Sequence, residues 1–236
     1  MNNLLKIMKK VSVCLIVIFL LFFNLHVVLA SSLGLPDVSE GQIQEAEGKI
    51  VPVRFLPGDP LYFAILGKEF VNRIFQPSSA KRAEFDLVLS GKRLKEAYLL
   101  VLKGNTNEAS DTLNRYSKQI GNMTDNLQKA RSQNQEVTPI VDSMAQNMQN
   151  HEILFSAIYK KTKNTKNAAN LQPALSNALK SFVKAVFVIN TIKPGVKDRF
   201  KTATSSAQLK KIVPADDTDT DTPLFSPSAK PRRIIY

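Results

Sequence analysis

The sequence contains a single cysteine among its 236 residues, and this residue, Cys14, lies in an apolar stretch near the N-terminus. If the first thirty residues are removed, as we expect below, the rest of the chain can form no disulfide and no cysteine-ligated metal site. About two hundred residues then remain, enough to bury a hydrophobic core that stabilises the fold without crosslinks. An exported chain of this kind suits bacteria better than eukaryotic secretion.

Histidine is also scarce, with His26 in the same N-terminal segment and His151 farther along. His151 and Glu152 begin like the helix motif of zinc proteases, which needs a second histidine four residues after the first, where this chain has Phe155. A catalytic triad would have only His151 to use, and no serine lies in a Gly-x-Ser-x-Gly turn. We therefore expect His151 to be a packed core residue, and we predict no catalytic, cofactor-binding or metal site and no enzymatic activity.

The first thirty residues resemble a secretory signal peptide. Three lysines precede an apolar run over residues 11–23, and small residues precede a cleavage position after Ala30. The apolar run extends to about twenty residues, enough to span a bilayer, so an uncleaved N-terminal anchor is the alternative to cleavage. A lipoprotein would need cysteine at position 31, which is Ser31. Both remaining interpretations place the protein outside the cytoplasm, secreted or at the cell surface, with membrane contact through the leader only if it is uncleaved.

Positive charge exceeds negative charge in the chain as a whole. The formal net charge is +12, and because three leader lysines contribute to it and the leader has no acids, the mature chain carries about +9. For an exported protein the available polyanions are anionic lipid and wall polymers, and we expect no nucleic acid partner. A lysine cluster is the candidate contact: Lys160, Lys161, Lys163 and Lys166. The alternatives are that these lysines complement a helix dipole and that the general excess of lysine only solubilises a helical surface.

Apolar and small residues recur at alternating spacings of three and four residues, which is typical of helices packed lengthwise on one another. No segment has the alternation of a β-strand. The pattern predicts an all-α fold, an antiparallel bundle of four to five helices, with a short Gly-Asn link joining two of the helices. The expected helices cover about residues 60–75, 79–103, 106–130, 137–163 and 168–192.

The domain organisation follows from these helices. Residues 1–30 are the expected signal peptide, and residues 31–55 are expected to be an irregular lead-in, with two prolines and three glycines and little apolar periodicity. The helical bundle should occupy residues 56–193. Residues 194–236 lack apolar periodicity and are expected to be a mostly disordered tail, with room for a short helix before Pro214.

Several short motifs occur in order along the first half of the chain. Residues 56–62 read Leu-Pro-Gly-Asp-Pro-Leu-Tyr, residues 93–97 read Arg-Leu-Lys-Glu-Ala, and a Gly-Asn break follows at residues 104–105. The arrangement resembles an uncharacterised family of exported bacterial helical proteins that share a domain of unknown function. The resemblance covers about residues 52–131, and the chain departs from the pattern at residues 64–67. It implies a helical fold and export, and it carries no activity.

One polar cluster near the first expected helix is a candidate for a specific role. It consists of Tyr62, Lys68, Glu69 and Arg93, and we expect it to anchor the first helix onto the following hairpin.

Three functions are consistent with the sequence. The first is an exported, non-enzymatic binding or structural module at the bacterial cell envelope, whose partner is anionic lipid, wall polymer or an envelope protein. The second is a protein–protein interaction or self-association module that uses a helical seam. The third is an enzyme with an unrecognised site, for which Glu69, Glu96 and His151 are the only candidate residues.

Overall fold

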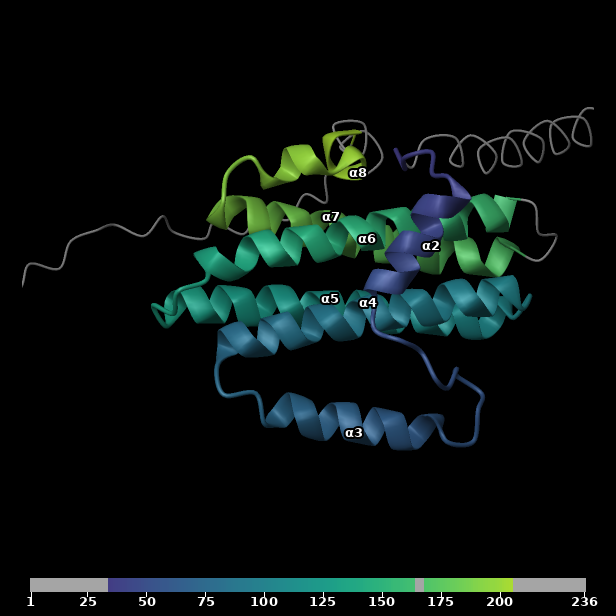
Figure 1. Cartoon of the computed structure of the whole chain (residues 1–236), viewed down its shortest axis with the longest axis horizontal. Helices are drawn as coiled ribbons and strands as arrows, with labels where there is room; N and C mark the ends of the chain where they lie inside the picture. Colours follow the sequence, from purple (N-terminus) through teal and green to yellow (C-terminus); the bar gives the residue numbers. More distant parts are fainter. Residues whose placement is uncertain (1–33, 164–167, 206–236) are drawn as a thin grey trace, which may run out of the picture.

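The computed structural model describes residues 34–163 and 168–205. All regular elements in these ranges are helices, and the four longest pack side by side as a bundle (Figure 1). The prediction of an all-α antiparallel bundle is therefore confirmed. The expected leader, the end of the expected tail and Lys166 lie outside the described residues. The four bundle helices are α4 (Ser79–Leu102), α5 (Thr106–Ser132), α6 (Thr138–Lys163) and α7 (Leu171–Ile192).

Local sequence signals fix the ends of α4 and α5. The Ser78 side chain accepts a hydrogen bond from the backbone N–H of Lys81, and the Asn105 side chain accepts one from that of Glu108. Between the two helices Gly104 has a φ of 75°, a conformation that favours glycine. The expected break between the two helices is therefore present at the predicted position.

The seams predicted from the spacing of apolar residues form the core. Because side chains three and four residues apart share one face of a helix, each seam is buried against its neighbours. The seam residues with almost no exposed surface include Ala83, Leu87, Leu94 and Ala97 in α4, Ala109, Leu113 and Ile120 in α5, Val141, Met144 and Met148 in α6, and Leu175, Ala178 and Ala185 in α7.

Four aromatic rings form a continuous row through this core. Tyr116 of α5 meets Phe155 of α6 edge to face, with ring centroids 5.1 Å apart. Phe155 meets Phe182 of α7 at 5.6 Å, and Phe182 meets Phe200 at 5.7 Å. Edge-to-face contacts stabilise such pairs beyond the area that they bury. The row joins three bundle helices to a segment that follows α7.

This last contact corrects the predicted boundary of the bundle at residue 193. Gly195 turns the chain with a φ of 89°, and the short helices η2 (Val196–Arg199) and α8 (Lys201–Ser205) then pack back on α7 (Figure 1). Phe200 is 1% exposed. The bundle therefore extends to Ser205, because a few apolar residues are enough to dock a segment too short to show periodicity, and α8 lies where the sequence left room for a short helix before Pro214.

The predicted irregular lead-in over residues 31–55 is also wrong in part, because it contains α2 (Glu40–Lys49), which packs across α6. Ser39 and Gln42 form a capping box at its start, in which each side chain bonds the backbone of the other residue. Only Ile43 and Ala46 of this helix are buried. Two apolar positions give no visible periodicity, so the capping box was the one sequence signal for this helix.

The remaining helix, α3 (Tyr62–Ile74), lies along one side of the bundle and contacts α4 (Figure 1). A single 3-10 turn, η1 (Ala168–Asn170), precedes α7. Within the described ranges, every helix is too short or too polar to cross a bilayer.

Candidate functional site

The side of α3 that faces the bundle carries three polar side chains beside the half-buried Ile65 and Leu66. Tyr62, Glu69 and Arg73 are separated by seven and four residues, so they lie on one face of the helix. This face is turned toward α4, which presents Lys92, Arg93, Glu96 and Asp86 to it. Helix α3 is therefore attached to the bundle by charged and hydroxyl groups, where a bundle helix normally has apolar side chains.

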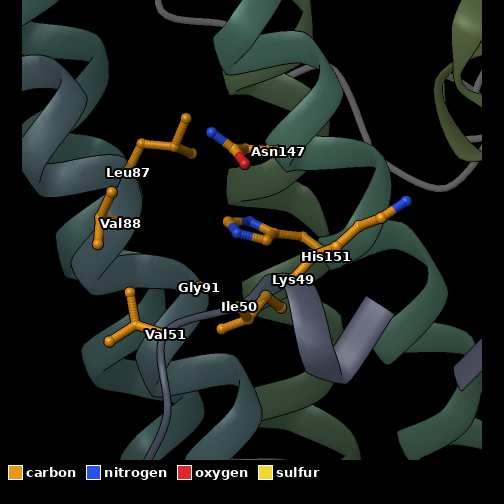
Figure 2. A pocket seen from close by; sticks show the side chains of 8 residues that line it. All are labelled: Lys49, Ile50, Val51, Leu87, Val88, Gly91, Asn147 and His151. Atoms are coloured by element: carbon orange, nitrogen blue, oxygen red, sulfur yellow. The ribbon is translucent and has the colours of Figure 1, made fainter. Parts of the chain in front are cut away.

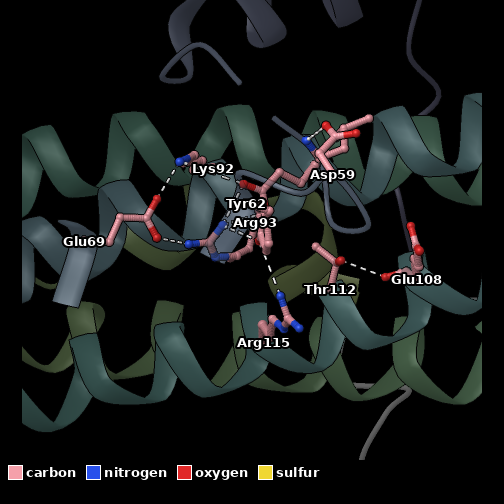
Figure 3. Close-up of polar contacts among 10 residues, drawn as sticks. Asp59, Tyr62, Glu69, Lys92, Arg93, Glu108, Thr112 and Arg115 are labelled. Atoms are coloured by element: carbon pink, nitrogen blue, oxygen red, sulfur yellow. Dashed lines mark hydrogen bonds and ion pairs between the residues drawn. The ribbon is translucent and has the colours of Figure 1, made fainter. Parts of the chain in front are cut away.

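The first attachment is a buried network around Arg93 (Figure 3). The Arg93 guanidinium donates to both carboxylate oxygens of Glu96, each at 2.6 Å, and to the Tyr62 hydroxyl at 2.8 Å. The Tyr62 hydroxyl in turn donates to Glu96 at 2.8 Å. Glu69 of α3 accepts from Arg93 and from Lys92. Two carboxylates and two cations thus balance one another across the junction of α3 and α4.

Burial determines the protonation of this network. Glu96 is 0% exposed, and Tyr62 and Arg93 are only slightly more accessible. Desolvation, reinforced by the negative charge of Glu96, raises the pKa of Tyr62 to about 12, although Arg93 opposes the shift. Desolvation also lowers the pKa of Lys92, and Glu96 opposes that shift. The tyrosine therefore stays protonated at neutral pH and acts as a hydrogen-bond donor, with no tendency to act as a base.

Arg115 of α5 joins the network from a third helix. Its guanidinium carbon lies 5.7 Å from the centre of the Tyr62 ring, and Nη1 donates to the hydroxyl at 3.4 Å (Figure 3). The Arg93 guanidinium carbon lies at the same distance from the ring centre. Two cations over one ring add a cation–π attraction to the hydrogen bonds. The start of α3 is thereby fixed to both α4 and α5.

A second attachment holds the end of α3. Asp86 of α4 is fully buried and accepts two hydrogen bonds from Arg73, from Nε at 2.6 Å and from Nη2 at 3.0 Å. The amides of Gln119 and Asn126 on α5 donate to the same carboxylate at 2.6 Å and 2.7 Å. This bonding raises the pKa of Arg73. Four donors occupy the carboxylate, so it has no free acceptor position for a substrate or a metal ion.

The opposite side of α3 is apolar and points away from the bundle. Phe63 is 73% exposed, Phe70 64% and Phe75 79%. These three side chains, together with Val71 and Ile74, are defined here as the outward face of α3. The sequence predicted this helix without predicting that its apolar side faces outward, since periodicity identifies an apolar face and not what covers it.

His151 lies in a small pocket between α2, α4 and α6 (Figure 2). It is 2% exposed, and its Nδ1 is 3.4 Å from the Tyr116 hydroxyl. Desolvation lowers the pKa of His151 to about 3, so the ring is neutral at physiological pH. Its Nε2 faces Gly91, where even a methyl group would come within 2.6 Å. His151 is therefore a packed core residue, as predicted.

No three histidine, cysteine, aspartate or glutamate side chains in the described part of the chain lie close enough to hold a metal ion.

The structure places three of the four predicted lysine contacts near the end of α6. Lys160 and Lys163 are exposed and line a pocket shared with residues 35–38, and the Lys160 ammonium donates to the Val38 carbonyl at 3.5 Å. Lys163 lies 5.5 Å from the centre of the Tyr159 ring, and Lys161 is 3.9 Å from a carboxylate oxygen of Glu40. Contact with a polyanion through these lysines stays a prediction.

The predicted polar cluster is largely present, since Tyr62, Glu69 and Arg93 meet in the network. Lys68 does not join it, because it is next to Glu69 in a helix and so points outward. The residues that sequence reasoning did not place in the cluster are Lys92, Glu96 and Arg115. The i, i+3 spacing of Arg93 and Glu96 was the available signal for Glu96.

Comparison with known proteins identifies one family. A family model described as a domain of unknown function, DUF5667, matches residues 54–172, half of the chain. The match begins before α3 and ends at the start of α7, so it extends well beyond the resemblance predicted over residues 52–131. No curated protein and no solved structure matches the chain.

Proposed function

Because this chain belongs to the DUF5667 family, whose domain has no known function, we propose a function from its geometry: an exported, non-enzymatic binding module of the bacterial cell envelope. The binding surface in this proposal is the outward face of α3. The observation that carries it is the inverted orientation of α3, which turns its ion-paired side chains toward the bundle and five of its large apolar side chains away from it.

The inverted orientation is unfavourable for an isolated molecule. Burying a large apolar side chain stabilises a protein by about 1.5–3 kcal/mol, and the outward face leaves five such side chains largely in water. Buried ion pairs, in contrast, contribute little net stability because both charges lose their hydration. An arrangement that buries the ions and exposes the apolar residues is therefore explained by a partner that covers the outward face.

The absence of catalytic activity is supported by the state of the candidate groups. Glu96 and Glu69 are both engaged by cations, and Asp86 accepts four hydrogen bonds. His151 is buried and neutral. A general acid or base must reach its substrate with a free position and a suitable pKa, and none of these groups has both.

The bacterial envelope as the place of action is supported by the sequence. The leader directs the chain to a membrane, and a chain whose one cysteine lies in that leader needs no oxidative folding. The basic net charge favours encounter with the anionic lipids and polymers of an envelope.

A second candidate function is self-association or protein–protein interaction through the same helix. It is favoured by Gly67, which lies on the exposed side of α3 and has no atom within 4 Å of the position where a side chain would begin. A glycine at this position allows close approach of another helix.

The test is binding of the purified full chain to bacterial envelope fragments and to lipid-free wall sacculi, measured by pelleting. The variant carries Phe63→Ser, Phe70→Ser and Ile74→Ser, which remove apolar side chains from the outward face without touching the polar network. The matched control is Phe187→Ser, an exposed phenylalanine of α7. The leader is the same in all forms, so a difference between them reports on α3.

We expect the unmodified chain and the Phe187→Ser control to pellet with the envelope, and the triple variant to stay largely in solution. Equal pelleting of all three forms would show that the outward face is not the binding surface.

A further inference from the structure

We infer that the outward face of α3 docks on an anionic lipid surface, with the helix lying flat in the interface. This inference rests on the proposed function and names the partner of the same face. Three properties of α3 carry it: the width of its apolar arc, the distribution of charge around that arc, and the small size of the helix.

The apolar arc of α3 is too wide for one partner helix. With 3.6 residues per turn, successive residues are about 100° apart, so Phe63, Phe70 and Ile74 lie within about 40° of one another. Val71 and Phe75 extend the arc to about 140°. A partner helix covers the narrow seam of a coiled coil, whereas a helix that lies in a lipid interface buries a broad arc at once.

The charges around the arc complement an anionic surface. Glu69 is the only acidic residue of α3, and Lys92 and Arg93 hold it against the bundle. Lys68 borders the arc beyond Phe75, is exposed, and has no carboxylate within ion-pair distance among the described residues. The exposed side of α3 therefore carries positive charge and no negative charge.

The position of Lys68 suits a phosphate headgroup. A lysine at the edge of a buried apolar arc extends its apolar stem along the acyl boundary and keeps its ammonium among the headgroups. Each such cation near an anionic membrane surface strengthens binding by roughly fivefold.

The size of α3 argues against a second copy of the chain as the occupant. The helix has 13 residues and is therefore about 20 Å long. A stable protein–protein interface uses about 20–30 residues on each side, which is more than the whole of α3. A lipid surface needs no matching patch of its own, so five exposed apolar side chains are sufficient to dock on it.

The test uses the absence of tryptophan from the full chain, which makes a single introduced tryptophan an unambiguous reporter. The reporter is Phe70→Trp on the outward face, and the matched control is Phe187→Trp on α7. Each full-length protein is mixed with vesicles of phosphatidylglycerol and phosphatidylcholine, and separately with vesicles of phosphatidylcholine alone. The readouts are the wavelength of tryptophan emission and its quenching by an aqueous quencher.

With anionic vesicles we expect the Phe70→Trp emission to shift to the blue and to lose its accessibility to the quencher. The Phe187→Trp emission should not change, even if the leader inserts into the same vesicles. Adding Phe63→Ser to the reporter should weaken partitioning by about tenfold, because it removes one buried aromatic side chain from the lipid-facing arc.

Three results would overturn the inference: no shift of Phe70→Trp with anionic vesicles, an equal shift with neutral vesicles, or a concentration-dependent shift without vesicles, which would identify a second copy as the occupant. If the reporter does not respond to lipid but the triple serine variant still loses envelope binding, the proposed function stands and the lipid assignment fails.

Discussion

At the scale of single residues, Glu96 is the residue on which the attachment of α3 depends most. It is fully buried and accepts hydrogen bonds from Arg93 and Tyr62, so a neutral side chain leaves a buried guanidinium without one of its two counter-charges. We predict that Glu96→Gln lowers the free energy of unfolding by about 3 kcal/mol, measured by urea denaturation followed by circular dichroism.

The control for Glu96 is Glu84→Gln, which removes a surface ion pair with Lys81. Pairs exposed to water contribute at most about 1 kcal/mol, so the control should change little. A loss as small for Glu96→Gln as for Glu84→Gln would contradict the view that this network attaches α3.

His151 makes stability depend on pH. Its pKa is lowered by burial from 6.5 to about 3, so the unfolded chain binds a proton that the folded chain excludes. The stabilisation is complete above the unfolded pKa and is lost as the pH falls from 6.5 toward 3. Between about pH 7 and about pH 5 we predict a loss of about 2 kcal/mol in the free energy of unfolding from this group.

The measurement is urea denaturation of the unmodified protein and of His151→Gln at both pH values. For each protein we compare the change in the free energy of unfolding between the two pH values. Absolute stabilities are not compared, because glutamine packs differently from histidine. Identical pH dependence of the two proteins would show that His151 is not the group responsible.

The sequence predicted residues whose role is set by local pattern and missed those whose role is set by tertiary position. The burial of Leu113 and Phe155 follows from spacing along one helix, and the exclusion of His151 as a ligand follows from a missing partner. Asp86 and Arg115, in contrast, acquire their roles from side chains on other helices. No periodicity within α4 or α5 shows which helix will lie beside them.

At the scale of helices, two glycines allow the steric effect of close packing to be compared with the intrinsic helix propensity of the residue. Gly91 in α4 faces the His151 ring, where an added methyl group would come within 2.6 Å of Nε2, whereas Gly121 in α5 has no atom within 4 Å of the same position. Alanine is favoured over glycine in a helix by about 1 kcal/mol. We predict that Gly121→Ala stabilises the protein by about 0.5–1 kcal/mol and that Gly91→Ala destabilises it by about 1–3 kcal/mol.

Thermal and urea denaturation of the two variants measure this difference. Stabilisation by both substitutions would mean that the His151 ring moves aside without cost, and the close contact between α4 and α6 would then not constrain the bundle.

Helices α2 and α3 mark the limit of prediction for whole elements. The existence of α3 was predicted from its proline-rich start, but its orientation was not, because an exposed apolar face and a buried one have the same sequence period. Helix α2 was missed because it buries only two residues. The orientation of α3 and the docking of α2 depend on which other segments pack against them. The local sequence of a helix does not identify those segments.

At the scale of the whole molecule, the family match and the folded unit have different limits. The match ends at residue 172, only two residues into α7, yet α7 completes the bundle and contacts α5 along its length. The fold also includes α2 before the match and α8 after it. The protein therefore folds as a unit larger than the matched domain, and the segment after Lys193 belongs to it.

The last prediction tests whether this segment is part of the cooperative core. Phe200 is 1% exposed and extends the aromatic row from Phe182, while a backbone N–H two residues later donates to the buried Glu152 carboxylate at 2.7 Å. Phe200→Ala removes a large side chain from a site enclosed by bundle helices, so we predict a loss of about 3–5 kcal/mol in the free energy of unfolding. Phe187→Ala, on the exposed side of α7, is the control and should lose less than about 1 kcal/mol in the free energy of unfolding.

If Phe200→Ala unfolds at the same urea concentration as the control, the segment after α7 is only loosely docked. If it unfolds earlier in a single transition, the row of aromatic rings from α5 to Phe200 is one cooperative structure, and the docking of the segment after α7 contributes to the stability of the helices that support α3.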